Sequence, residues 1–201
     1  MAIGTEIIKR FNLQVDDSSE LSTNESLALA QEVYEDIQND RSWEWLKTEF
    51  TGVTSTTVPY ITLPTDFKSM AINKDNKTIV FVGDKFEEYI VVGFSERRNY
   101  RDKDGYCYID LPNNRLVFTK QPTEVKTIEY DYIMIAPALL FASEPMFTGH
   151  DYIISYGMAA KFNPIELTDK GVSYQRENQA EYLRMLSDMR MEDTLIKLAL
   201  S

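Results

Sequence analysis

The chain has 201 residues, of which 43% are hydrophobic and 12% aromatic, the composition of a folded protein able to bury a substantial core. Its 32 acidic and 21 basic residues give a formal charge of −11, which repels phosphate polymers and anionic lipid surfaces. This charge argues against a protein that reads nucleic acid sequences.

Cys107 is the only cysteine, which excludes an internal disulfide and a metal site built from several cysteines. Its neighbours Tyr106, Tyr108 and Ile109 predict a small buried side chain rather than a reactive thiol. No stretch approaches the roughly 18 apolar residues that a membrane-spanning helix requires, and the first residues do not resemble a signal peptide. We therefore expect a soluble protein.

Residues 5–41 predict two helices. Ile7, Ile8 and Phe11 fit one apolar face of a short helix over residues 5–13. A second helix is predicted over residues 22–41. It begins with a capping box, in which Ser22 and Glu25 each accept a hydrogen bond from the other's backbone N–H. Apolar residues at three- and four-residue steps then form one face of this helix: Leu27, Ala30, Val33, Tyr34 and Ile37.

Residues 42–67 contain both tryptophans and join this helical region to a β-rich one. The β-branched run at residues 53–58 favours a strand, because such side chains lose rotamer freedom in a helix. Two prolines restrict that strand to an edge or an interrupted form. We expect the following residues to join the helices and the sheet through one core: Trp43, Trp45, Leu46, Leu63, Pro64 and Phe67.

The middle of the chain predicts β-hairpins. Residues 79–82 and 89–92 are short apolar runs on either side of a charged turn, typical of one hairpin. Residues 106–111 and 115–119 predict a second hairpin around a Pro-Asn-Asn turn. A further strand is predicted over residues 126–134, where apolar and polar residues alternate.

Helices return over residues 150–162 and 173–200. The order of helices, strands and helices predicts an α+β fold, in which N-terminal and C-terminal helices form a helical bundle with an inserted antiparallel β-hairpin or sheet region. We expect one domain with these parts: residues 1–201 in all, helical parts at about 5–50 and 150–200, and a β-rich insertion at about 51–135.

The sequence contains no motif that indicates catalysis or a cofactor. A Gly-rich phosphate loop, a Gly-x-Ser-x-Gly turn and a Cys-x-x-Cys pair are all absent. His150, the only histidine, stands at a predicted helix start, where a capping or surface role is typical. We therefore expect no enzyme, no cofactor and no metal. The enzymatic alternative is a small hydrolase that acts through carboxylates.

Arg97, Arg98, Tyr100 and Arg101 form the only basic cluster. Basic residues beside an aromatic ring could hold a nucleic-acid backbone, contact an acidic protein surface, or lie in a solvated loop without a specific role. Of these, a protein contact ranks first.

Several motifs occur in the order found in one protein family. The capped helix at residues 22–41 leads into Asp-Arg-Ser-Trp-Glu-Trp-Leu at residues 40–46 and Tyr-Ile-Thr-Leu-Pro-Thr-Asp-Phe at residues 60–67. Ile-Glu-Tyr-Asp-Tyr at residues 128–132, two prolines, a short helix and a long Glu- and Met-rich C-terminal helix follow. In this layout the chain resembles the head-to-tail adaptor, or connector, proteins of tailed bacteriophages, particularly the ring protein beneath the portal in short-tailed phages.

The resemblance implies a structural virion protein that is assembled in the bacterial host cytoplasm and does not bind a membrane. Its copies would form a closed ring, a dodecamer, that docks onto the portal, extends the DNA channel and attaches the tail or a second ring protein. DNA would pass an acidic channel wall without specific binding. In this view the helices build the ring wall and the hairpins project as docking surfaces.

We assign contacts by surface chemistry. The C-terminal residues are expected to contact the portal, because apolar residues after an amphipathic helix can dock into a neighbour's groove: Ile196, Lys197, Leu198, Leu200 and Ser201. The basic cluster and an acidic helix face are expected to contact other subunits or the tail: Arg97, Arg98, Tyr100, Arg101, Glu32, Glu35 and Asp36. The alternative function is a tail-associated component that binds carbohydrate or a cell surface, suggested by the tyrosines at residues 100–108.

Overall fold

The structure is a computed structural model that describes residues 3–15, 21–73, 76–83, 87–140, 142, 144–147, 149–150, 152–162 and 169–200, except the side chains of residues 3–4, 169–173 and 200. The chain divides into two compact units. Unit 1 is helical and comprises Met1–Trp45 and Ala136–Ser201, whereas unit 2 contains the sheet and comprises Leu46–Ile135.

Unit 1 contains four α-helices within its described residues: α1 (Ile3–Val15), α2 (Thr23–Asp40), α3 (Ile153–Lys161) and α4 (Asp169–Leu200). The predicted capping box begins α2. The Ser22 backbone N–H donates to the Glu25 carboxylate over 2.8 Å, and the Glu25 N–H donates to the Ser22 hydroxyl. The helix predicted over residues 173–200 begins four residues earlier, at Asp169.

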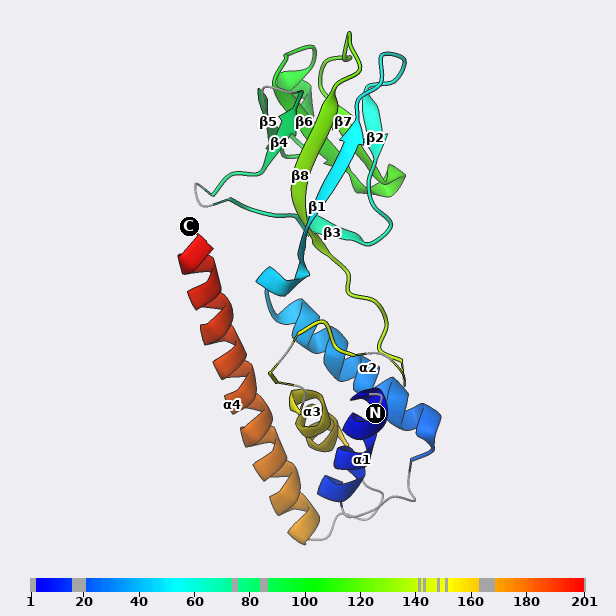
Figure 1. Ribbon diagram of the computed structural model, residues 1–201, viewed down its shortest axis with the longest axis vertical. Coiled ribbons are helices and arrows are strands. Elements are labelled where there is room, and N and C mark those ends of the chain that lie inside the picture. The colour runs from blue at the N-terminus through cyan, green and yellow to red at the C-terminus, as the bar shows by residue number, and fades with distance from the viewer. Residues whose placement is uncertain are drawn as a thin grey trace. The chain divides into compact units, whose positions relative to one another are not determined.

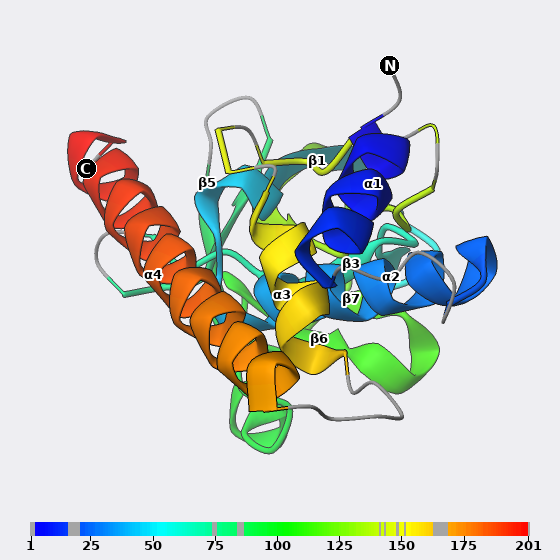
Figure 2. The same ribbon diagram turned by 90° about the horizontal axis from the view of Figure 1, so that it is seen from below.

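Helix α3 lies at the centre of unit 1, between α1 and α4 and against α2 (Figures 1 and 2). It is almost entirely apolar, and Ile153, Ile154 and Met158 are fully buried. The apolar faces of α1 and α2 pack around it, and α4 contributes Met185, Leu186 and Met189. This arrangement explains why α3 lacks the polar face of a surface helix.

Gly157 lies on α3 between side chains of α2 and α4. A Cβ at this position would lie 2.5 Å from Val33 Cγ1 and 3.0 Å from the Tyr182 ring. We expect Gly157→Ala to lower the free energy of unfolding by about 1–2 kcal/mol, because overpacking outweighs the gain of about 1 kcal/mol in helix propensity. Thermal unfolding measures the change. Gly93→Ala is the matched control, because its Cβ would meet nothing closer than 3.7 Å; equal losses for both variants would contradict the close approach.

Unit 2 contains one mixed sheet, with eight strands among the described residues, that curves until it is nearly closed (Figure 1). The strands are β1 (Lys47–Val53), β2 (Tyr60–Thr62), β3 (Phe67–Met70), β4 (Ile79–Val82), β5 (Glu87–Val92), β6 (Tyr106–Asp110), β7 (Arg115–Phe118) and β8 (Thr127–Met134). Their order is β1-β8-β4-β5-β6-β7-β2, and β3 also pairs with β8. Short 3-10 helices accompany them: η1 (Glu44–Leu46), η2 (Arg97–Tyr100) and η3 (Leu111–Asn113).

The core of unit 2 is the inner face of this curved sheet. Inward-facing side chains from β4, β6, β7 and β8 are buried together, among them Val80, Cys107, Leu116 and Ile128. Burial raises the pKa of the Cys107 thiol to about 12, so this thiol is protonated and inert at neutral pH, as its apolar neighbours predict.

The predicted helical bundle with an inserted antiparallel hairpin region is wrong. Both predicted hairpins form, as β4–β5 and β6–β7, but they belong to one continuous sheet. Strand β8 joins β1, β3 and β4, and β5 pairs with β6 in parallel. The β-rich part is therefore a nearly closed eight-stranded sheet, and the four α-helices come from the two ends of the described chain.

Charge is distributed unequally between the units. Residues 46–135 contain 12 of the 21 Lys and Arg residues and 13 of the 32 Asp and Glu residues. Unit 1 therefore holds 9 basic and 19 acidic residues, a formal charge of −10 against −1 for unit 2. None of the helices that the structure describes is long and apolar enough to cross a membrane.

Candidate functional site

The inner face of α4 changes from apolar to polar at Asp193. Met185, Leu186 and Met189 are buried at helical spacing, and Asp193 follows Met189 by one turn. The Asp193 side chain is itself only 4% exposed. A carboxylate buried to this degree requires charged or hydrogen-bonding partners.

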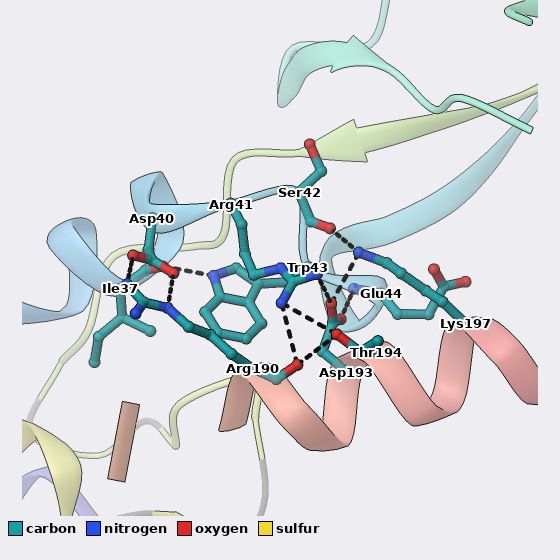
Figure 3. A network of polar contacts seen from close by, with 10 residues as sticks. All are labelled: Ile37, Asp40, Arg41, Ser42, Trp43, Glu44, Arg190, Asp193, Thr194 and Lys197. Atoms are coloured by element: carbon teal, nitrogen blue, oxygen red, sulfur yellow. Dashed lines mark hydrogen bonds and ion pairs between the residues drawn. The ribbon is translucent and has the colours of Figure 1, made fainter. Parts of the chain in front are cut away.

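One hydrogen-bond donor and two cationic side chains converge on Asp193. The backbone N–H of Glu44 donates to Oδ1 over 2.6 Å, while Lys197 Nζ and Arg41 Nη2 lie 2.8 and 3.3 Å from Oδ2. Figure 3 shows the Arg41 and Lys197 side chains extending toward this carboxylate from the end of α2 and from α4. Asp193 therefore ties the chain after α2 to the last turns of α4.

Trp43 is the apolar half of the same attachment. Its side chain is fully buried, and its Nε1 donates to the carbonyl of Ile37 over 2.6 Å (Figure 3). The ring stacks against Trp45 at a centroid distance of 6.2 Å. Trp45 in turn meets the ring of Phe147 edge to face at 5.4 Å.

A second ion pair lies one helical turn before Asp193. Arg190 donates two hydrogen bonds to the Asp40 carboxylate, one of them from Nε over 2.9 Å. These hydrogen bonds hold the pKa of the Asp40 carboxyl below its usual value, although partial burial opposes the shift. The C-terminal half of α4 is thus attached to α2 by polar contacts.

An open groove of about 190 Å³ lies beside this network within unit 1. Apolar side chains form most of its wall: Trp43, Trp45, Phe147, Met189 and Ile196. His150 and Glu192 provide polar groups, with His150 Nε2 2.9 Å from a Glu192 oxygen. The Glu192 side chain is 62% exposed, so a carboxylate stands at the edge of an aromatic groove.

The lining of the groove is typical of a binding site. In the described part of the chain, no group of three or more His, Cys, Asp or Glu side chains is placed to hold a metal ion. Apolar walls with a few polar groups are typical of sites that receive an apolar ligand or side chain. The groove is therefore the candidate binding site of unit 1.

Unit 2 carries a separate surface of aromatic and basic side chains around η2. The guanidinium of Arg97 lies 3.8 Å from the centre of the Phe94 ring, and Lys103 Nζ lies 5.2 Å from that of Tyr100. Phe94 meets Tyr108 edge to face at 5.9 Å, and Tyr100 packs against Tyr106 at 4.5 Å. Phe94 remains 46% exposed, the largest exposure of a phenylalanine in the described residues.

A smaller pocket of about 70 Å³ in unit 2 is lined by polar groups that already contact one another. Tyr89 donates to Asp104 over 2.8 Å, and Lys120 also contacts this carboxylate at 3.0 Å. Burial and the Asp104 carboxylate raise the pKa of Tyr89. We regard this cluster as a structural element of unit 2.

The residues predicted to contact the portal have different surroundings where the structure describes them. Ile196 lines the groove, and Lys197 points to Asp193 and donates to the Ser42 carbonyl. Leu198 is exposed to solvent. The side chain of Leu200 and all of Ser201 lie outside the described residues.

The basic cluster and the acidic face lie on different units. Arg97 stacks on Phe94, Arg98 is exposed, Tyr100 packs on Tyr106, and Arg101 lies 3.7 Å from Asp102. On α2, Glu32 and Asp36 each lie 2.6 Å from Lys161, and Glu35 accepts from Gln31. Much of the predicted acidic face is therefore already engaged within unit 1.

The predicted junction residues are divided between the units. Trp43 and Trp45 belong to unit 1, whereas Leu46 and the later members belong to unit 2. Trp43, Leu46 and Leu63 are buried, and Trp45, Pro64 and Phe67 are partly buried. The stretch thus contributes to two separate cores rather than to one.

The sequence-based prediction missed Asp193, Arg41, Glu192 and Phe94. A signal for Asp193 was present, because a carboxylate one turn after Met189 on the apolar stripe of a helix must find partners. His150, predicted as a capping or surface residue, instead lies beside Glu192, and α3 begins only at Ile153. No comparable signal marks Phe94. No known protein family matches the chain, and no curated protein matches it.

Proposed function

We propose that the chain is a structural subunit of a phage head-to-tail connector. In this proposal its copies form a cyclic ring, a dodecamer, that docks onto the portal, extends the DNA channel and attaches the tail. The order of the motifs at residues 22–67 and the long C-terminal helix support the proposal, because both resemble those of connector proteins. The protein would act without catalysis and reside in the virion.

The observation that carries the proposal is the outer face of the last turns of α4. Met191, Leu195 and Leu198 follow the i, i+4, i+7 spacing of one helical face and are 59%, 64% and 67% exposed. The opposite face, with Met189 and Asp193, is packed inside unit 1. A helix with apolar residues on both faces is suited to dock its outer face into a groove of another protein.

The charge of unit 1 is compatible with a channel wall. A formal charge of −10 neutralises few DNA phosphates, so DNA would slide past without being retained. This property supports a passage for DNA rather than a site that holds it.

Leu195→Asp is expected to weaken binding to the portal at least about tenfold, because a carboxylate would enter the centre of an apolar contact. Co-sedimentation with the portal protein encoded in the same genome measures this binding. Leu183→Asp is the control, because Leu183 is exposed on the same helix but three turns earlier. Unchanged binding by Leu195→Asp, with a melting temperature like that of the wild type, would contradict the assignment.

The point substitution is a cleaner test than a deletion of residues 196–201. Such a deletion also removes Lys197, which contacts Asp193 and the Ser42 carbonyl. A loss of docking could then reflect a loosened α4 rather than a lost contact.

A further inference from the structure

We propose that the groove of unit 1 receives Phe94 of a second copy of this chain, and that Arg97 and Arg98 of that copy reach the carboxylate at its edge. This contact would join neighbouring subunits of the proposed ring, so the inference rests on the proposed function. It concerns surfaces different from the outer face of α4.

The groove fits a phenyl ring in size and chemistry. Its volume of about 190 Å³ exceeds the roughly 150 Å³ of an apolar cavity that binds benzene. Of the side chains that line it, the partly buried Trp45 and the exposed Met146 and Ile196 can contact an inserted aromatic group, with Trp43 and Phe147 packed behind Trp45. The exposed Glu192 carboxylate gives the edge of the groove a negative charge.

Phe94 has the complementary properties. It is an exposed aromatic side chain, held by Tyr108 on one side and by Arg97 over its ring. Arg98 is exposed beside it. Aromatic residues, phenylalanine among them, and arginine are both enriched in protein interfaces.

The distribution of charge selects a second copy as the occupant and sets the direction of the contact. Unit 1 carries −10 and unit 2 only −1, so two copies that meet through unit 1 alone would repel each other. A contact from the arginines of unit 2 to the acidic unit 1 of another copy avoids this repulsion. Each copy then offers one groove and one Phe94, a heterologous contact that can close into a ring.

The test measures self-association and groove occupancy together. Wild-type protein is studied over a concentration series by sedimentation velocity, and tryptophan emission is recorded at each concentration. Both tryptophans of the chain line the groove, and Trp45 is partly exposed there, so an inserted ring should change the tryptophan emission through Trp45. We expect concentration-dependent association with a shift in emission, and association at least about tenfold weaker in Phe94→Ala.

Two further comparisons separate the proposed contact from other effects. Phe81→Ala removes another exposed phenylalanine of unit 2 and should change association by less than about twofold. Arg98→Glu and Glu192→Arg should each weaken association, and their combination in one chain should recover most of it.

Several outcomes would overturn the inference. The wild type could stay monomeric at every concentration, or Phe94→Ala could associate as the wild type does. Association could also occur without a change in tryptophan emission, or the variant that combines Arg98→Glu with Glu192→Arg could fail to recover association. Another protein or a small molecule would then be the occupant of the groove. Failure of the connector function would instead appear as absent portal binding, which this experiment does not measure.

Discussion

Replacing Trp43 with alanine is expected to lower the free energy of unfolding by about 3–5 kcal/mol. The side chain is fully buried, stacks on Trp45, and donates a hydrogen bond to the Ile37 carbonyl. The alanine variant loses this apolar burial, leaves a cavity and leaves that carbonyl without its donor. Chemical denaturation followed by circular dichroism measures the change.

Trp45→Ala is the matched comparison. Trp45 is only partly buried, and its expected loss is about 1.5–3 kcal/mol. Equal losses for Trp45→Ala and Trp43→Ala would contradict this account, because the fully buried Trp43 would then contribute no more to stability than the partly buried Trp45.

Replacing Asp193 with alanine is expected to lower the free energy of unfolding by about 2–4 kcal/mol. The substitution removes the acceptor of the Glu44 N–H and the carboxylate that forms ion pairs with Arg41 and Lys197. The expected loss is smaller than for a fully buried ion pair, because the side chains of Arg41 and Lys197 are 30% and 35% exposed and solvent screens their charges. Denaturant titration again provides the measurement.

Asp188→Ala provides the control for Asp193. Asp188 lies on the same helix and contacts Arg184 over 2.6 Å, but this pair is largely exposed and should contribute no more than about 0.5 kcal/mol. A small loss for Asp193→Ala, equal to that of Asp188→Ala, would show that Asp193 does not hold α4 in place.

Local patterns predicted the helices and both hairpins, but the strand expected at residues 53–58 is wrong, because β1 spans Lys47–Val53 and residues 54–59 lie outside any strand. The Ser22 and Glu25 capping box begins α2 as expected, because both partners lie within one helical turn. The two hairpins, β4–β5 and β6–β7, also form where turn residues separate short apolar runs. In each case the interacting residues are close in the sequence, so the signal is local.

The joining of the strands into one sheet could not be predicted in this way. Strand β8 pairs with β1, whose residues lie some 80 positions earlier, and no local pattern marks such a partner. The parallel pairing of β5 with β6 depends on the connection through η2, which looks in the sequence like a polar excursion. Distant pairing therefore decided the fold class, and the prediction of a helical bundle with inserted hairpins failed.

The prediction of contact surfaces was limited in a similar way, because the sequence does not show which charged side chains pair within the fold. The acidic residues of α2 were predicted from their side of the helix alone, but Lys161 on α3 contacts both Glu32 and Asp36. Lys197 was predicted as a terminal contact residue, yet it points inward to Asp193. For Glu32 and Asp36 the partner lies on another helix, and only the packing of unit 1 brings these charges together. For Lys197 the partner lies one turn earlier on α4 itself, but burial of that part of the helix was not visible in the sequence.

The two units divide the proposed work between them. Unit 1 carries the acidic surface, the groove and the outer face of α4, whereas unit 2 carries the exposed Phe94 and its arginines. In the proposed ring, unit 1 would provide the wall, the portal contact and the receiving groove. Unit 2 would supply the side chain that fills the groove of the next copy.

Electron microscopy of the purified chain mixed with the portal protein of the same genome tests the connector function most directly. The proposal predicts a closed ring of this chain bound to one end of the portal, with an open channel along the common axis. Portal particles that remain bare while the chain stays free in solution, at concentrations well above those of both proteins in an infected cell, would contradict it.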